Sequence, residues 1–235
     1  MADFSSESER QEALYKEVFT ESAKIIRNEV EKLKPQDSCK FCTIPCDIKK
    51  PDIFSVFPPN CPYGNWQIQA LSYLTNEYRS KLRAGKKALM EKKKDYSCLK
   101  CGACCKLAVS AYNPIQLRQM SVRGDKFARE FSSIFVPYDS EEMAEAVCPE
   151  FYAKLKDLMD LNERLYFYYC RKLGADNLCS DYENRPDICK DFPMTPLKTL
   201  PDTCGFLPWH NMIERQAMSI KAREDLIRFY KDRLG

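Results

Sequence analysis

The stretch Cys98-Leu-Lys-Cys101-Gly-Ala-Cys104-Cys105 places four cysteines in one short run. Two residues between successive cysteines let a tight turn aim their sulfurs at one centre, and Gly102 lets the backbone wrap closely. Zinc ribbons use two separated pairs of this spacing, whereas three in a run are more typical of the cubane-binding segment of bacterial ferredoxins. Since adjacent cysteines rarely point at one ion, we expect Cys104 and Cys105 to serve different sites, or one to support the other.

The rest of the chain favours metal as the use of these thiols. Its 235 residues include thirteen cysteines but only one histidine, His210, so any metal must be held almost wholly by sulfur. The N-terminus is acidic and polar, unlike a secretory signal, and no stretch approaches the roughly 18 apolar residues of a membrane span. We therefore expect a cytoplasmic protein without a membrane partner, in which thiols stay reduced and bind metal rather than form disulfides.

Composition and motifs exclude several other classes of protein. Apolar residues make up 44% of the chain and charged residues 30%, which suits a soluble globular protein, and the net charge of +3 is too small to predict an acidic partner. The sequence has no nucleophile elbow, P-loop or dinucleotide fingerprint, and no recognisable pair of catalytic carboxylates. Any enzymatic activity would therefore have to come from a bound metal.

Apolar periodicity predicts a mainly α fold in which helices flank irregular cysteine-rich metal-binding loops, with little or no sheet. Irregular segments as long as these are uncommon unless something holds them, and metal binding at thiolates also supplies folding energy. Asn113 and Ser140 are predicted to begin helices, and Asn211 to cap the last helix with Glu214 in a capping box. The predicted elements are helices over 8–34, 65–94, 114–122, 126–135, 141–161 with a break at Cys148-Pro149, and 211 onward, and a short strand over 165–170.

These elements suggest three regions. The first comprises N-terminal helices with an extra cysteine quartet and a basic helix, the second is the metal-binding core, and the third is a C-terminal helix packing on that core. Their predicted bounds are 1–97, 98–209 and 210–235.

Further cysteines downstream could complete sites that the first run begins. Cys170, Cys179, Cys189 and Cys204 are separated by gaps too wide for zinc knuckles. Pro186 is expected to open a short helix, whose N-terminal dipole would favour the Cys189 thiolate.

The run from Cys98 to Cys105, followed by Cys170 and by Cys179-Ser-Asp-Tyr182-Glu183-Asn-Arg185-Pro186-Asp-Ile-Cys189-Lys-Asp-Phe192-Pro193, resembles the YkgJ-type cysteine-cluster proteins. These are also called the CxxCxxCC family of zinc- or iron-chelating domains. The resemblance extends from about Cys98 to Cys204 and implies metal chelation without a settled common reaction. A flagellin lysine methylase carries a similar motif, so the resemblance also admits a cluster-dependent enzyme, either a protein-lysine methylase or a redox enzyme. Asp181 departs from the family pattern, which tends to have an apolar residue before the tyrosine.

Taken together, these features predict an iron–sulfur protein. Cys98, Cys101 and Cys104 would hold three corners of a [4Fe–4S] cluster and Cys179 or Cys189 the fourth. Cys105, Cys170 and Cys204 would complete a second site or support the first. Zinc in all-sulfur sites is the alternative, and the role would be structural, electron-transferring or metal-handling. The expected metal ligands are Cys98, Cys101, Cys104, Cys105, Cys170, Cys179, Cys189 and Cys204.

The sequence says less about the role of the other five cysteines and of the histidine. A proline-rich segment carries four thiols that form either a second metal site or a set of free thiols: Cys39, Cys42, Cys46 and Cys61. We expect Cys148 to be a small buried hydrophobe on a helix. We expect His210 to be an ordinary surface or capping group rather than a ligand.

A basic stripe offers a third function. Side chains within about 120° of arc on the second long helix could meet nucleic acid or an acidic protein, but most such stripes are solvated helix faces. The favoured partners are thus metal ions or clusters, with a protein partner possible and nucleic acid disfavoured. The stripe consists of Arg79, Arg83, Lys86, Lys87, Lys93 and Lys94.

Overall fold

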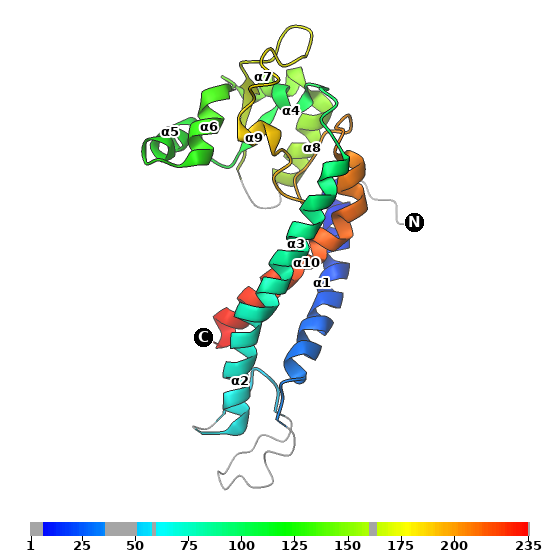
Figure 1. Ribbon diagram of the computed structural model, residues 1–235, viewed down its shortest axis with the longest axis vertical. Helices are drawn as coiled ribbons and strands as arrows, with labels where there is room; N and C mark the ends of the chain where they lie inside the picture. Colours follow the sequence, from blue (N-terminus) through cyan, green and yellow to red (C-terminus); the bar gives the residue numbers. More distant parts are fainter. Residues whose placement is uncertain (1–6, 36–50, 58–59, 160–163, 235) are drawn as a thin grey trace. The chain divides into compact units, whose positions relative to one another are not determined.

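The computed structural model describes residues 7–35, 51–57, 60–159 and 164–234 (Figure 1). The chain divides into two compact units, one formed by Met1–Glu12 and Met90–Glu214 and the other by Ala13–Leu89 and Arg215–Gly235. Helices predominate and only one small sheet is present in the described part, so the predicted mainly α fold is confirmed. None of the described helices is long and apolar enough to cross a membrane.

Long helices build the unit of Ala13–Leu89 and Arg215–Gly235. They are α2 (Pro62–Tyr73), a π-helical turn (Leu74–Tyr78) and the parts within these bounds of α1 (Glu7–Glu31), α3 (Arg79–Glu91) and α10 (Leu207–Leu234). The turn joins α2 and α3 into the long helix that the sequence predicts, which ends in a 3₁₀ turn (Lys92–Asp95).

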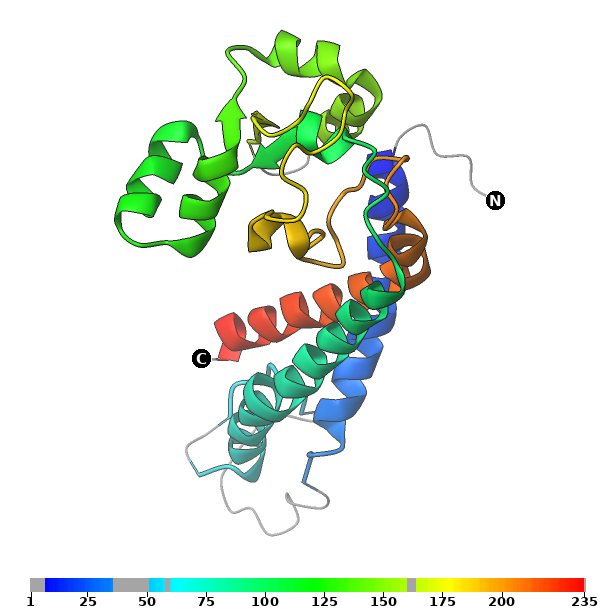
Figure 2. The same ribbon diagram turned by 45° about the horizontal axis from the view of Figure 1, so that its top comes forward.

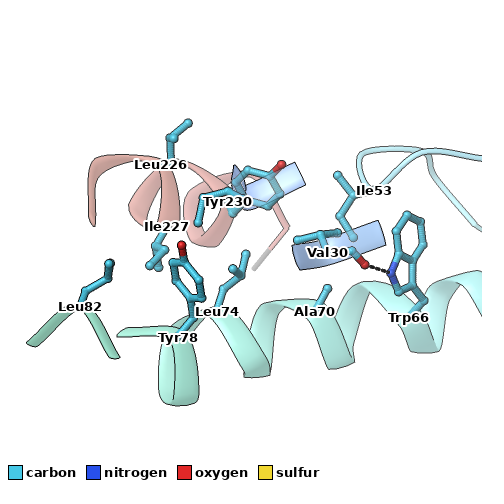
Figure 3. Packing of buried hydrophobic residues seen from close by; sticks show 11 residues of the cluster. Val30, Ile53, Trp66, Ala70, Leu74, Tyr78, Leu82, Leu226, Ile227 and Tyr230 are labelled. Carbon is cyan, nitrogen blue, oxygen red and sulfur yellow. Dashed lines mark hydrogen bonds between the residues drawn. The ribbon is translucent and has the colours of Figure 1, made fainter. Parts of the chain in front are cut away.

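The apolar faces of these helices meet in one core (Figure 3). Trp66 is buried at its edge, where its indole N–H donates to the carbonyl oxygen of Val30 at 2.9 Å, so the ring is buried without an unpaired donor. Leu74 of the π-helical turn is fully buried in the same core. The core residues are Ile26, Val30, Ile53, Trp66, Ala70, Leu74, Tyr78, Leu82, Leu226, Ile227 and Tyr230.

Basic residues of α3 lie on the side of the helix away from this core. Arg79, Arg83, Lys86 and Lys87 are all exposed, while Leu82 and Leu89 of the same helix are buried. Lys94 is exposed as well, but Lys93 is half-buried and its ammonium donates to the carbonyl oxygen of Asp191 at 2.6 Å. The predicted stripe is therefore solvent-facing except at Lys93.

The predicted start of the last helix at Asn211 is wrong, because α10 begins at Leu207. Pro208 lies in the first turn, where its missing N–H removes no helical hydrogen bond. Glu214, expected in a capping box, instead accepts two hydrogen bonds from the guanidinium of Arg10, at 2.6 and 2.8 Å. This paired contact explains how a carboxylate that is only 8% exposed is satisfied.

A three-stranded antiparallel sheet organises the unit that contains most of the cysteines. Strands β1 (Ala108–Ser110), β2 (Phe135–Pro137) and β3 (Tyr166–Cys170) pair in the order β1-β3-β2. The predicted strand over 165–170 is confirmed as the central strand β3. The edge strands were not predicted, because three residues are too few to show the alternation that identifies a strand.

Two pairs of helices cover the two faces of this sheet (Figure 2). Phe167 packs with residues of α7 (Glu141–Val147) and α8 (Pro149–Met159). The next residue, Tyr168, packs with α5 (Pro114–Val122) and α6 (Lys126–Ile134). Successive strand residues point to opposite faces, so Cys170 lies on the same face as Tyr168.

Local signals fix where these helices begin. Asn113 and Gln116 form a reciprocal capping box at α5, Asp125 caps α6, and Ser140 caps α7. The predicted break at Cys148-Pro149 separates α7 from α8. Cys148 is half-buried and packs against the cluster around Phe167, so its expected role as a small hydrophobe is supported.

Replacing Leu74 by alanine tests the helical core. The change removes a fully buried side chain and leaves a cavity, so the free energy of unfolding should fall by about 2–5 kcal/mol in urea denaturation. Ile68→Ala on neighbouring α2 is the matched control, because Ile68 is 69% exposed and its loss should change stability by less than about 0.5 kcal/mol. Equal losses in the two variants would contradict the burial of Leu74.

Candidate metal centre

Every metal ligand expected between residues 98 and 204 lines one cavity of about 330 Å³. The thiols come from the segment around α4 (Ala103–Lys106), the end of β3, the loop that leads into α9 (Asp187–Lys190), and the turn before α10. They are Cys98, Cys101, Cys104, Cys105, Cys170, Cys179, Cys189 and Cys204.

Gly102 shapes the first cysteine run. Its φ of +74° is in the left-handed region, and a Cβ there would lie 3.1 Å from the carbonyl oxygen of Asn177. Only glycine meets both demands without strain, as the sequence suggests. Two residues before Gly102, the backbone N–H of Lys100 donates to the sulfur of Cys98 at 3.4 Å.

A second close approach brings the last cysteine beside the first. A Cβ on Gly205 would lie 2.1 Å from the carbonyl oxygen of Ser97, so the two backbones pass each other with no room for a side chain. Burial raises the pKa of the Cys204 thiol, and the nearby sulfurs of Cys101 and Cys98 raise it further. Cys204 thus shares its electrostatic environment with the first two cysteines of the run.

Cys105 faces a different neighbour. Its pKa is raised chiefly by hydrogen bonding with the adjacent Cys104 thiol, and it also interacts with the thiol of Cys170. The pKa of Cys170 is raised in turn, first by Cys105 and then by burial, although the backbone N–H of Lys172 donates to its sulfur at 3.4 Å. This pair joins α4 to the end of β3.

Cys189 reaches the same group from α9. The backbone N–H of Ile188 donates to the Glu130 carboxylate of α6 at 3.0 Å, and Lys126 pairs with Asp187 at 2.6 Å. The short helix after Pro186 is as predicted, but the expected lowering of the Cys189 pKa is wrong. Burial raises this pKa to about 11, with the sulfurs of Cys170 and Cys179 adding to the effect, and a helix of only four residues offers little opposing field.

The wall of the cavity also carries charges that sequence reasoning missed. Lys100, Arg185 and Lys198 line it, and no aspartate or glutamate does so among the described residues. The ammonium of Lys100 lies 4.2 Å and the guanidinium of Arg185 3.5 Å from the centre of the Tyr182 ring. These cation–π contacts tie the first cysteine run to the segment between Cys179 and Cys189. Their only sequence signal was the presence of Tyr182 and Arg185 in the family-like segment.

An all-sulfur donor set fits zinc or iron and does not fit magnesium or calcium, which prefer oxygen ligands. Within the described ranges, no three cysteine, histidine or acidic side chains already converge closely enough to hold an ion. Coordination would therefore require the sulfurs to draw together, to about 2.3 Å from a zinc ion.

The remaining expected ligands lie elsewhere. Cys39, Cys42 and Cys46 fall outside the described residues, and Cys61 is buried just before α2, in the other unit, so a second site there stays a prediction. His210 does not line the cavity. The expectation that His210 lies at the surface is wrong, because this residue is only 7% exposed. Its Nδ1 has no hydrogen-bond partner in the described part of the chain.

Residues 97–205 match the family model of CxxCxxCC, described as "Putative zinc- or iron-chelating domain". Just under half of the chain is thus similar to this domain. The resemblance noted in the sequence is confirmed, and the matched range contains all eight cysteines that line the cavity. Comparisons with curated proteins and with solved structures gave no match.

Replacing Gly205 by alanine tests the close approach that brings Cys204 to Cys98. The new Cβ would meet a backbone carbonyl that cannot rotate away, so unfolding free energy should fall by about 1–3 kcal/mol and bound metal should decrease. Gly64→Ala is the matched control, since its nearest neighbour, Cβ of Phe57, would be 3.7 Å away. Thermal unfolding and metal analysis of both variants provide the measurement, and equal behaviour would contradict the close approach.

Proposed function

We propose that the CxxCxxCC domain binds two metal centres in one cavity, each through four cysteine thiolates. The first centre would use Cys98, Cys101, Cys104 and Cys204. The second would use Cys105, Cys170, Cys179 and Cys189.

The neighbours of each sulfur support this division. Cys204 is influenced by Cys98 and Cys101, whereas Cys189 is influenced by Cys170 and Cys179. Cys105 interacts most strongly with its chain neighbour Cys104 and next with Cys170, and the Cys170 contact supports assigning it to the second group. This grouping differs from the sequence-based one, in which Cys204 belonged with Cys105 and Cys170.

Cys104 and Cys105 connect the two groups. They are consecutive residues of α4, so their side chains leave the helix about 100° apart and can serve different centres. The spacing of two residues from Cys101 favours Cys104 for the first centre. Each centre then has four sulfurs and no cysteine of the cavity is left over.

The preferred occupant of at least one centre is a [4Fe–4S] cluster, because three cysteines in succession at this spacing are typical of cubane ligation. Such a cluster supplies one-electron chemistry, whereas zinc would act as a structural staple. The thiols would remain available in a reducing cytosol. The protein would therefore serve in electron transfer, metal handling or stabilisation of its own fold, and phenylalanines in the cavity wall, such as Phe131 and Phe151, would shield the centres from water.

Metal analysis of the chain purified without oxygen tests this function. Iron and sulfide at about four each per cluster, with broad visible absorption, are expected for a cubane. Zinc at about one ion per four thiols without colour would assign the staple role. Less than a tenth of an equivalent of iron or zinc, in both anaerobic and aerobic preparations, would overturn the proposal.

Cysteine variants test the division into two centres. Cys98→Ser and Cys204→Ser should each lose one centre, and the double variant should lose no more than either single one, because both residues serve the same site. Combining Cys98→Ser with Cys170→Ser should lose both centres. Cys148→Ser is the control and should keep the full metal content, since Cys148 packs in an apolar cluster. Equal metal loss in the two double variants would contradict the division.

A further inference from the structure

Three basic side chains, Lys100, Arg185 and Lys198, line the same cavity as the thiols. We propose that Lys198, supported by Lys100 and Arg185, supplies the counter-charge of the metal–thiolate centres. This inference rests on the proposed function and extends it by naming the residues that set the charge of the site.

The need for a counter-charge follows from the ligands. Four thiolates around a divalent zinc ion, or around a [4Fe–4S] core of the same charge, leave a net charge of about −2 on each centre. Two such centres in one cavity repel each other, and a charge removed from water is costly unless an opposite charge lies near it.

The lining of the cavity matches this need. Its charged side chains in the described structure, apart from the thiols, are all basic: Lys100, Arg185 and Lys198. Surface aspartates and glutamates of the same unit pair with other lysines, as in the contacts of Lys126 with Asp187 and Lys154 with Asp202. The described lining thus carries positive charges and no carboxylate. This charge distribution is complementary to that of an anionic metal centre.

Lys198 differs from the other two cations. Lys100 and Arg185 both rest on the Tyr182 ring, but no ion pair or side-chain hydrogen bond involves Lys198 within the described ranges. Burial lowers the pKa of its ammonium, and no other charge offsets this effect. Metal binding displaces thiol protons, so the negative charge of the centres that would compensate Lys198 arises as the metal binds.

The position of Lys198 is set by its backbone. The N–H of Leu197 donates to the hydroxyl of Thr195 at 3.2 Å, and the N–H of Lys198 donates to the Thr195 carbonyl at 3.4 Å. This turn lies between Cys189 and Cys204, which belong to different centres. A protonated lysine has no lone pair to offer a metal, so Lys198 acts on the centres through its charge and is a positioning residue rather than a ligand.

Zinc affinity of a charge series at residue 198 tests the inference, with a chromophoric chelator as competitor. Lys198→Met should weaken zinc binding about tenfold, as loss of outer-shell partners commonly does. Lys198→Arg should restore the affinity because it keeps the charge, and Lys198→Glu should weaken it further. Lys92→Met is the matched control, since Lys92 is exposed in the same unit and does not line the cavity.

Unfolding temperatures measured with excess chelator show whether a loss of zinc affinity comes from the changed charge or from a less stable fold. The Met variant should unfold at or above the wild-type temperature, because it removes an ammonium that burial disfavours, and the Arg variant should not unfold above the wild type. Weaker zinc binding in the Met variant then does not come from loss of the fold. Wild-type affinity in Lys198→Met, or the same loss in the Met and Arg variants, would overturn the counter-charge while leaving the two-centre function in place. A wild-type chain that binds neither zinc nor iron would overturn both proposals.

Discussion

The backbone of Gly205 passes so close to the carbonyl of Ser97 that no side chain fits between the two segments. This contact brings the two ends of the matched range 97–205 together, although more than a hundred residues separate them in sequence. Gly102 makes a similar approach to Asn177 and so joins the first cysteine run to the loop that carries Cys179. Loops without regular structure are thereby fixed by backbone contact at positions where glycine alone is tolerated, and the thiols reach one cavity.

The small sheet and its helices supply the rest of the framework. Cys170 ends the central strand, where its pairing with Phe135 of β2 limits its movement. Cys189 is held through α9, whose first turn is bonded to Glu130 and Lys126 of α6. Phe131 of α6 also packs against Tyr168 of β3. The same rigid elements therefore position Cys170 and Cys189. Rigid placement of this kind lowers the entropy that ordering a metal site would otherwise cost.

Opposing electrostatic effects act on the sulfurs. Burial and neighbouring thiols raise the pKa values of Cys105, Cys170, Cys189 and Cys204, which favours the protonated form. The backbone N–H of Lys172 donates to Cys170, and three cations line the wall without any described carboxylate, which favours the thiolate form. A divalent metal displaces the remaining protons and adds its own positive charge, so binding and deprotonation are coupled.

The sequence by itself determined the helical class, the caps of α5 and α7, the strand at Tyr166–Cys170 and the eight cysteines that line the cavity. These features follow from local spacing, periodicity or the family-like motif, which are readable along the chain. Only the tertiary structure decided that Cys204 lies with Cys98 and Cys101, that Cys105 meets Cys170, and that Lys198 lines the cavity. These contacts depend on close backbone approaches and strand pairing between segments that are distant in sequence. The spacing of residues along the chain does not predict which distant segments meet.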